Sequence, residues 1–287
     1  MPHQRQLHVN GIEIAIFEWG QPQAGQPAIL FTHANGFHAR VWDQVITNLP
    51  GYHCFALDLR GHGRSSQVAP PDDKDWRVFA EDVVAVGQQL GLGGAVGVGH
   101  SLGGHTVTLA AALQPELFGH LLLIDPVIFP RENYIGAVEI GQFAARRRNQ
   151  WQSADEMFER FKDRPPFNLW KSEVLRDYVD YALLPNPSGD GFVLACAPEF
   201  EAAIYNLSTA SNIYPEIATI QAPVTILRAA EPISDGSFDF SASPTAPDLA
   251  QQFPDATDVA LSDYTHFIPM QAPELIAQYI RAIATNL

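Results

Sequence analysis

The chain has 287 residues, of which 46% are hydrophobic and 17% are charged, so it is long enough to bury a large core without a disulfide or a metal. Acidic residues outnumber basic ones by 32 to 17, which gives a formal net charge of −15. A surface this acidic repels phosphate backbones and anionic lipid, so we expect no nucleic-acid partner and no membrane partner.

The first predicted element is a β-hairpin. Two runs of alternating apolar and polar residues flank Asn10-Gly11, a dipeptide that favours the tight turn between antiparallel strands. Short apolar runs then recur between helical stretches, and each has the length and composition of a strand buried on both faces. These runs are Ala28–Phe31, Cys54–Leu57, Ala95–Val98, Leu121–Ile124, Val224–Leu227 and Asp258–Leu261.

Strands that alternate with helices predict an α/β fold, here a mostly parallel eight-stranded sheet with helices on both faces. The alternation is interrupted after the sixth strand. Residues 126–215 are rich in helix formers and large aromatic residues and show no convincing buried strand. We therefore expect a helical cap at 126–215, inserted into a core made of residues 1–125 and 216–287. Loops at the carboxyl ends of parallel strands line the ligand crevice, so this cap would act as a lid.

The sequence around Ser101 indicates a nucleophile. A buried apolar run leads into Gly99-His100-Ser101-Leu102-Gly103, and an alanine-rich helix follows directly. This is the strand–turn–helix context that the G-x-S-x-G nucleophile elbow requires. The tight turn lifts the hydroxyl of Ser101 clear of the sheet, and it leaves the Leu102 N–H at a helix N-terminus, where that group can stabilise an oxyanion.

Two other interpretations of this stretch are weaker. Ser101 could be a plain helix N-cap. Alternatively, Gly97, Gly99 and Gly103 could form a dinucleotide-binding loop, with Asp125 as the acid that binds the ribose. That fingerprint normally follows the first strand of its unit, however, and the third glycine is one residue late here.

Five motifs, in this order along the chain, resemble those of the α/β-hydrolase fold superfamily. They are Thr32–Gly36, Asp58–Ser65, Gly99–Gly104, Leu121–Pro126 and Thr265–Glu274. The resemblance covers nearly the whole chain and implies a serine hydrolase with a helical cap, from a bacterial subgroup without a defined substrate. It also implies that the backbone N–H of Asn35 is a second oxyanion donor, although Ala34 replaces the glycine of the family's oxyanion loop.

The general base is predicted to be His266. A serine hydroxyl is a weak nucleophile and needs an adjacent base. His266 follows the last predicted strand on a short loop, in the family's chain order of serine, acid and histidine. His100 and His105 lie close to Ser101 in sequence, but their places in the turn and in the helix direct them elsewhere.

The acid is ambiguous in the sequence. Most members of the family carry it in a Gly-x-x-Asp phrase after the seventh strand, and this chain has Leu227–Pro232 instead. Glu231 lies one residue before the expected position, and Asp235 and Asp239 lie farther along. We favour Asp125, at the end of the sixth predicted strand, with Glu231 and Asp235 as its main rivals.

These residues predict an enzyme that transfers an acyl group from a small, fairly apolar substrate to water. Carboxylesterases, thioesterases and lactonases catalyse such reactions, and we expect no metal and no organic cofactor. One alternative is hydrolysis of a carbon–carbon bond by the same triad. Another, from a different class, is a receptor that keeps the triad and barely turns over. Haloalkane dehalogenation and epoxide opening are disfavoured because both need a carboxylate where Ser101 stands.

The remaining features are structural. No stretch approaches the roughly 18 apolar residues of a membrane span, and the N-terminus lacks a secretory apolar segment, so we expect a cytoplasmic monomer or homodimer. Cys54 and Cys196 are predicted to be buried thiols. The basic run Arg146-Arg147-Arg148 is interpreted as a solvated helix face.

Overall fold

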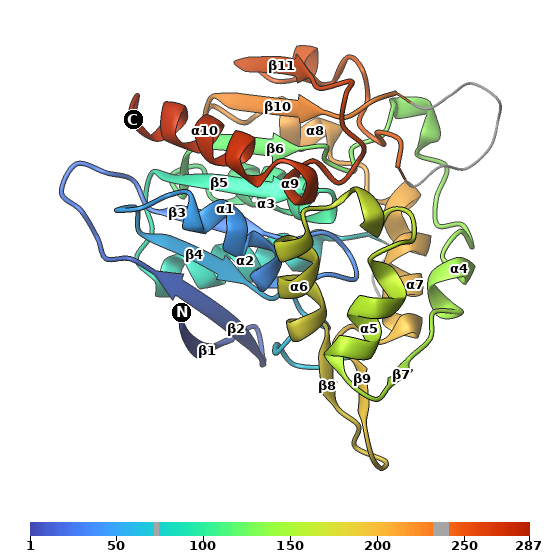
Figure 1. The fold of residues 1–287 in the computed structure, drawn as a ribbon. Helices are drawn as coiled ribbons and strands as arrows, with labels where there is room; N and C mark the ends of the chain where they lie inside the picture. The colour runs from blue at the N-terminus through green and yellow to red at the C-terminus, as the bar shows by residue number, and fades with distance from the viewer. Residues whose placement is uncertain (72–74, 232–240) are drawn as a thin grey trace.

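The computed structural model describes residues 1–71, 75–231 and 241–287. Its main sheet has eight strands in the order β1-β2-β4-β3-β5-β6-β10-β11 (Figure 1). These strands are β1 (His3–Val9), β2 (Ile12–Trp19), β3 (Ile29–Thr32), β4 (Cys54–Leu57), β5 (Ala95–His100), β6 (Phe118–Ile124), β10 (Val224–Arg228) and β11 (Ala256–Ala260). β2 pairs antiparallel with β1 and β4, and all other neighbours pair in parallel. The predicted fold class is confirmed.

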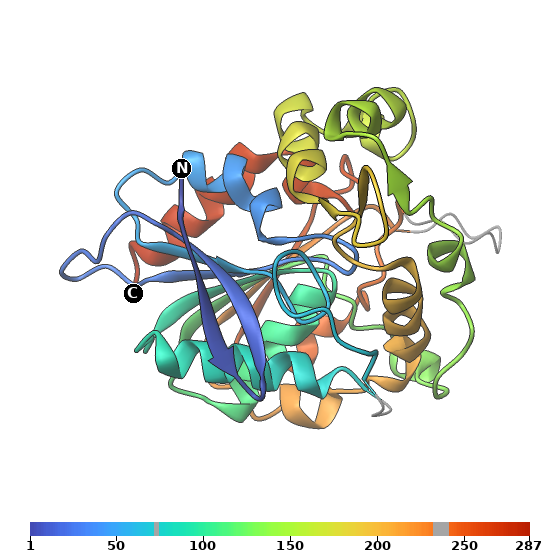
Figure 2. The ribbon, with the colours of Figure 1, turned by 90° about the horizontal axis from the view of Figure 1, so that it is seen from below.

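Helices cover both faces of this sheet (Figure 2). One face carries α1 (Asp43–Thr47) and α10 (Pro273–Ala284), and the other carries α2 (Arg77–Gln89), α3 (Leu102–Leu113) and α8 (Tyr214–Ile217). Alternate residues of each central strand enter opposite cores, so Leu122 of β6 packs toward α1 and α10, while Leu123 packs toward α2 and α3. This two-sided burial explains why the central parallel strands β3, β4, β5 and β6 are largely continuous apolar runs.

The segment 126–215 lies beyond the carboxyl ends of the parallel strands (Figure 1). It contains the helices α4 (Gln142–Ala145), α5 (Ala154–Phe161), α6 (Ser172–Tyr181) and α7 (Pro198–Leu207). It also contains a small antiparallel sheet of β7 (Gln150–Trp151), β9 (Phe192–Leu194) and β8 (Leu183–Pro185). The sequence showed no convincing buried strand in this segment, because strands of two or three residues are too short to show an alternating pattern.

Two expectations about the chain as a whole can be compared with the structure. Cys54 and Cys196 are both buried free thiols, as predicted. Among the described residues, no helix combines the length and the apolar character that crossing a membrane would require.

Candidate active site

Ser101 occupies the turn between β5 and α3. Its backbone has φ of 58° and ψ of −118°, a strained conformation for a residue with a side chain. The two flanking glycines make this turn possible. A Cβ on Gly99 would lie 2.3 Å from the carbonyl oxygen of Gly103, and a Cβ on Gly103 would lie 2.4 Å from that of Thr32. The turn thus places the Ser101 hydroxyl at the floor of a cavity beyond the sheet.

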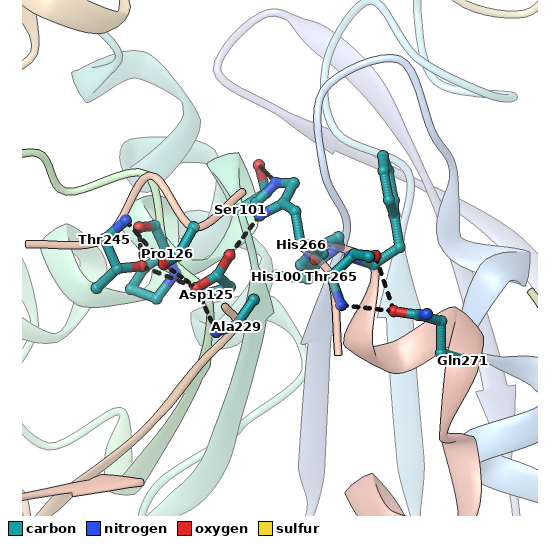
Figure 3. Close-up of polar contacts among 11 residues, drawn as sticks. His100, Ser101, Asp125, Pro126, Ala229, Thr245, Thr265, His266 and Gln271 are labelled. Carbon is teal, nitrogen blue, oxygen red and sulfur yellow. Dashed lines mark hydrogen bonds and ion pairs between the residues drawn. The ribbon is translucent and has the colours of Figure 1, made fainter. Parts of the chain in front are cut away.

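His266 lies within hydrogen-bond distance of Ser101. Its Nε2 is 3.0 Å from the Ser101 Oγ, and its Nδ1 is 2.6 Å from the Oδ2 of Asp125 (Figure 3). Because a carboxylate only accepts hydrogen bonds, Nδ1 carries the proton and Nε2 is left to accept the serine proton. The loop that carries His266 is held in place by His100, whose Nε2 donates to the His266 carbonyl oxygen at 2.8 Å.

Asp125 directly follows β6, has φ of 44° and is completely buried. Its Oδ1 accepts a hydrogen bond from the Ala229 N–H at 3.0 Å and another from the Ser243 hydroxyl. Its own N–H donates to the carbonyl oxygen of Leu227 at 2.7 Å. β6 and β10 are neighbours in the sheet, so the end of β10 supplies a backbone donor that holds the carboxylate of Asp125.

The other proposed acids lie elsewhere or outside the described residues. Glu231 is exposed, and its carboxylate lies 3.6 Å from the Nη1 of Arg228. Asp235 and Asp239 are not among the residues that the structure describes. In the described part of the chain, Asp125 is the carboxylate that accepts the Nδ1–H of His266.

Asn35 lies on the loop after β3, close to the nucleophile. Its side-chain Nδ2 donates to the carbonyl oxygen of Glu201 at 3.0 Å, so the side-chain amide is already engaged. The next residue, Gly36, donates its N–H to the Nε2 of His62 at 3.1 Å. Asn35 and Leu102 both line the cavity, together with Ser101 and its histidine partner.

Two buried imidazoles hold this loop against the loop that follows β4. The Nδ1 of His33 donates to the Ala34 carbonyl oxygen at 2.8 Å, while its Nε2 accepts the Leu59 N–H at 3.0 Å. Burial lowers the pKa of His62 to about 4 and also lowers the pKa of His33. Both rings are therefore neutral near pH 7, which lets each one donate at one nitrogen and accept at the other.

An ion pair at the cavity wall has no counterpart among the features predicted from the sequence. Arg147 pairs with the buried carboxylate of Glu201 and also donates to the Tyr178 hydroxyl at 3.0 Å. Burial opposes the charge of Arg147, but the interactions with Glu201 and Tyr178 together outweigh that effect and raise the pKa of the guanidinium. The interpretation of Arg146–Arg148 as a solvated helix face was wrong for Arg147, because α4 ends before this run and Arg147 turns inward, whereas Arg146 and Arg148 are exposed.

The cavity has a volume of about 840 Å³ and is mainly apolar. Aromatic side chains from the segment 126–215 and from the loop after β3 form much of its wall, among them Phe37, Phe161, Phe167 and Tyr178. Within residues 1–71, 75–231 and 241–287, no cluster of three or more His, Cys, Asp or Glu side chains is arranged to hold a metal ion. A serine hydroxyl within hydrogen-bond distance of an imidazole is the arrangement that base activation of a nucleophile requires.

Comparisons with known proteins agree with this geometry. Residues 29–279 match the model of the Alpha/beta hydrolase family. The chain belongs to the alpha/beta hydrolase family. This confirms the resemblance read from the five motifs, and it places the chain in a family of hydrolases. In this alpha/beta hydrolase, the family match runs through both the sheet and the segment 126–215.

Curated relatives match over part of their length. A bifunctional esterase/perhydrolase of Acinetobacter calcoaceticus is 42% identical over 109 residues, which cover 37% of this chain and 38% of that protein. An esterase of Mycobacterium tuberculosis is 37% identical over 114 residues, which cover 39% of this chain and 36% of that protein. Among solved structures, E-2-(acetamidomethylene)succinate hydrolase superposes with a TM-score of 0.80 and 21% identity over the whole of both chains. That structural likeness concerns the fold.

Proposed function

We propose that this chain is a serine hydrolase that cleaves an ester-type bond, namely a carboxylic ester, a thioester or a lactone, through an acyl-enzyme. The observation that carries the proposal is the continuous hydrogen-bonded series from Ser101 through His266 to Asp125 at the floor of the cavity. The names of the esterase relatives support the same bond type.

In the proposed reaction, the Ser101 Oγ attacks the substrate carbonyl carbon while the Nε2 of His266 takes the hydroxyl proton. The imidazolium then returns this proton to the leaving oxygen or sulfur as the bond to the carbonyl carbon breaks. A water molecule, deprotonated by the same nitrogen, hydrolyses the acyl-enzyme and restores the Ser101 hydroxyl. Asp125 keeps the proton on Nδ1 and stabilises the imidazolium that forms in both halves.

The oxyanion is proposed to be held by the backbone N–H groups of Leu102 and Asn35. Leu102 is the first residue of α3, where the N–H groups of the first turn have no acceptor inside the helix. The Asn35 side chain donates to Glu201, so the backbone N–H is the group assigned to the oxyanion. Two such donors, fixed before the substrate binds, stabilise negative charge where it develops.

Gly36→Ala tests the role of the Asn35 loop. A Cβ on Gly36 would lie 2.6 Å from the Oε1 of Glu201 and 3.2 Å from the Nη1 of Arg147. Because the ion pair with Arg147 holds the Glu201 carboxylate in place, we expect the loop to move to relieve these contacts. The kcat for ester hydrolysis should then fall by roughly 10- to 100-fold, up to the cost of losing one oxyanion donor.

Gly11→Ala is the matched control for this substitution. Gly11 has φ of 79°, close to the 78° of Gly36, and a Cβ there would meet no atom within 4 Å. Both variants should lose about 1–2 kcal/mol of stability from backbone strain, but only Gly36→Ala should lose kcat. Equal kcat in the two variants would remove Asn35 from the oxyanion site.

We also propose that residues 126–215 form a cap that selects the acyl chain. Phe161 and Phe167 line the cavity, with stacked rings whose centroids are 4.3 Å apart. Phe167→Ala should enlarge the acyl site, so the ratio of kcat/KM for 4-nitrophenyl decanoate to that for the butyrate should rise by about tenfold, or ~1.4 kcal/mol.

Phe158→Ala is the control for this change, because Phe158 packs against the same core without lining the cavity. Its ester preference should stay within about twofold of wild type, since a large effect needs loss of a contact with the substrate. The same panel tests the proposed function itself. If wild-type protein turned over no ester, thioester or lactone of any chain length, the assignment as an ester hydrolase would be wrong.

A further inference from the structure

The charge of the cavity wall differs from that of the protein as a whole. The chain carries a formal net charge of −15. Among the described residues that line the cavity, however, four arginines face two carboxylates. The arginines are Arg147, Arg148, Arg160 and Arg164, and the carboxylates are Glu201 and Glu231. A wall with an excess of cations in such an acidic protein favours a ligand that carries negative charge.

Two of these arginines are neutralised within the protein. Arg147 pairs with Glu201, and Arg148 pairs with Glu156, whose Oε1 lies 2.6 Å from its Nη2. The charges of these two arginines are therefore balanced before any ligand binds. Their side chains form part of the cavity wall and hold neighbouring residues through ion pairs and hydrogen bonds.

The other two arginines are unpaired in the part of the chain that the structure describes. Arg160 lies in the last turn of α5, and Arg164 lies four residues later, after the helix has ended. Both side chains are exposed at the cavity, and neither forms an ion pair with a carboxylate of residues 1–71, 75–231 or 241–287.

The acidic side chains of α5 each form an ion pair with another cation, although Glu156 also has a weaker electrostatic attraction to Arg160. Asp155 pairs with Arg176 at 2.8 Å, and Glu159 pairs with Lys162 at 2.6 Å. Glu156 is the partner of Arg148. The local carboxylates thus leave the guanidinium groups of Arg160 and Arg164 available at the cavity rim.

We propose that Arg160 and Arg164 bind a carboxylate on the substrate, at the end remote from the bond that is cleaved. The substrate would then be amphipathic, with an apolar body against the aromatic wall and an anionic end at the rim. Guanidinium groups bind carboxylates through paired N–H donors, and two of them four residues apart at one cavity fit this use. The inference rests on the proposed ester hydrolysis and narrows its substrate class.

The test compares matched esters that differ only in charge. On the acyl side, the mono-4-nitrophenyl ester of octanedioic acid is compared with 4-nitrophenyl octanoate. On the alcohol side, the octanoate ester of 4-hydroxybenzoate is compared with that of 4-hydroxybenzamide. Wild-type kcat/KM should be higher for the anionic member of at least one pair, in spite of the negative charge of the protein.

The double variant Arg160→Gln/Arg164→Gln should lower kcat/KM for that anionic ester by about tenfold, while kcat/KM for its neutral partner stays within about twofold. The effect is modest because both side chains are exposed, and added salt should weaken the wild-type preference through screening. Arg146→Gln is the matched control. It removes one positive charge from an exposed side chain in the same region, where Arg146 bonds to Gln142 and does not line the cavity.

The outcomes separate this inference from the proposed function. If the neutral esters are hydrolysed and the double variant loses nothing on either anionic ester, the anion site is wrong and the esterase stands. An equal loss on anionic and neutral esters would also overturn it, because the arginines would then act on the structure of the cap. If no ester is hydrolysed by wild-type protein, the proposed function fails and this inference falls with it.

Discussion

Ser101→Ala is expected to lower kcat for ester hydrolysis by about 10⁶-fold, the loss found when the nucleophile of a well-studied serine hydrolase is removed. The Oγ of Ser101 is the atom that lies 3.0 Å from the Nε2 of His266, and alanine leaves nothing there for the base to activate. The side chain is small and sits at the cavity floor, so the fold should survive and the melting temperature should change little.

A fluorophosphonate probe gives a second measurement of the same prediction. Wild-type protein should take up one equivalent, mapped to the peptide that contains Ser101, and the alanine variant should take up none. Ser208→Ala is the control, because Ser208 also lines the cavity but its buried hydroxyl has no hydrogen-bond partner among the residues that the structure describes. That variant should be labelled and should turn over like wild type. An adduct on another residue, or unchanged hydrolysis by Ser101→Ala, would relocate the nucleophile.

The sheet could be predicted because its sequence signals are local. The central parallel strands are largely apolar runs between turn residues, because they are buried on both faces. The elbow could be predicted for a similar reason. Gly99 and Gly103 are needed because the backbones of the turn, of α3 and of β3 approach too closely for any side chain.

The carboxylate proposed to orient His266 could not be identified from the sequence alone, because its position depends on which strand ends lie side by side in the fold. Asp125 and Ala229 lie 104 residues apart in the chain, yet the pairing of β6 with β10 puts the Ala229 N–H 3.0 Å from the Asp125 Oδ1. Ser243, which donates to the same oxygen, carries no sequence signal at all. The run Leu227–Pro232 lacks the usual acid, and its backbone instead holds an acid that belongs to the neighbouring strand.

The structure of the segment 126–215 was harder still to predict from the sequence. Arg147 follows α4 in a run of three arginines whose composition indicates solvent, and only the packing of α7 beside it supplies the Glu201 carboxylate that draws it inward. The short strands β7, β8 and β9 are defined by their pairing with one another and not by periodicity. Both features arise from tertiary contacts that a single sequence does not display.

Asp125→Asn should lower kcat by about 10⁴-fold while the fold survives, as in the corresponding substitution in a serine protease. The amide oxygen of asparagine can still accept from the Ala229 N–H and the Ser243 hydroxyl, so the buried polar groups keep their partners. The amide nitrogen, however, faces the Nδ1 of His266 as a donor. The ring must then carry its proton on Nε2, where it can no longer accept the proton of Ser101.

Three measurements make this result specific for Asp125. Near-ultraviolet circular dichroism and the melting temperature should stay close to wild type, which separates a catalytic loss from unfolding. Fluorophosphonate labelling of Ser101 should slow in parallel with kcat, because both reactions need the activated hydroxyl.

The third measurement concerns the two rival acids. Glu231→Gln and Asp235→Asn should each lower kcat by less than about tenfold, or ~1.4 kcal/mol, since Glu231 is exposed beside Arg228 and neither side chain is assigned to His266. If either of these variants proved to be the inactive one, with Asp125→Asn close to wild type, the acid would lie in the segment after β10. The hydrogen bond between Asp125 and His266 would then serve only to hold the loop.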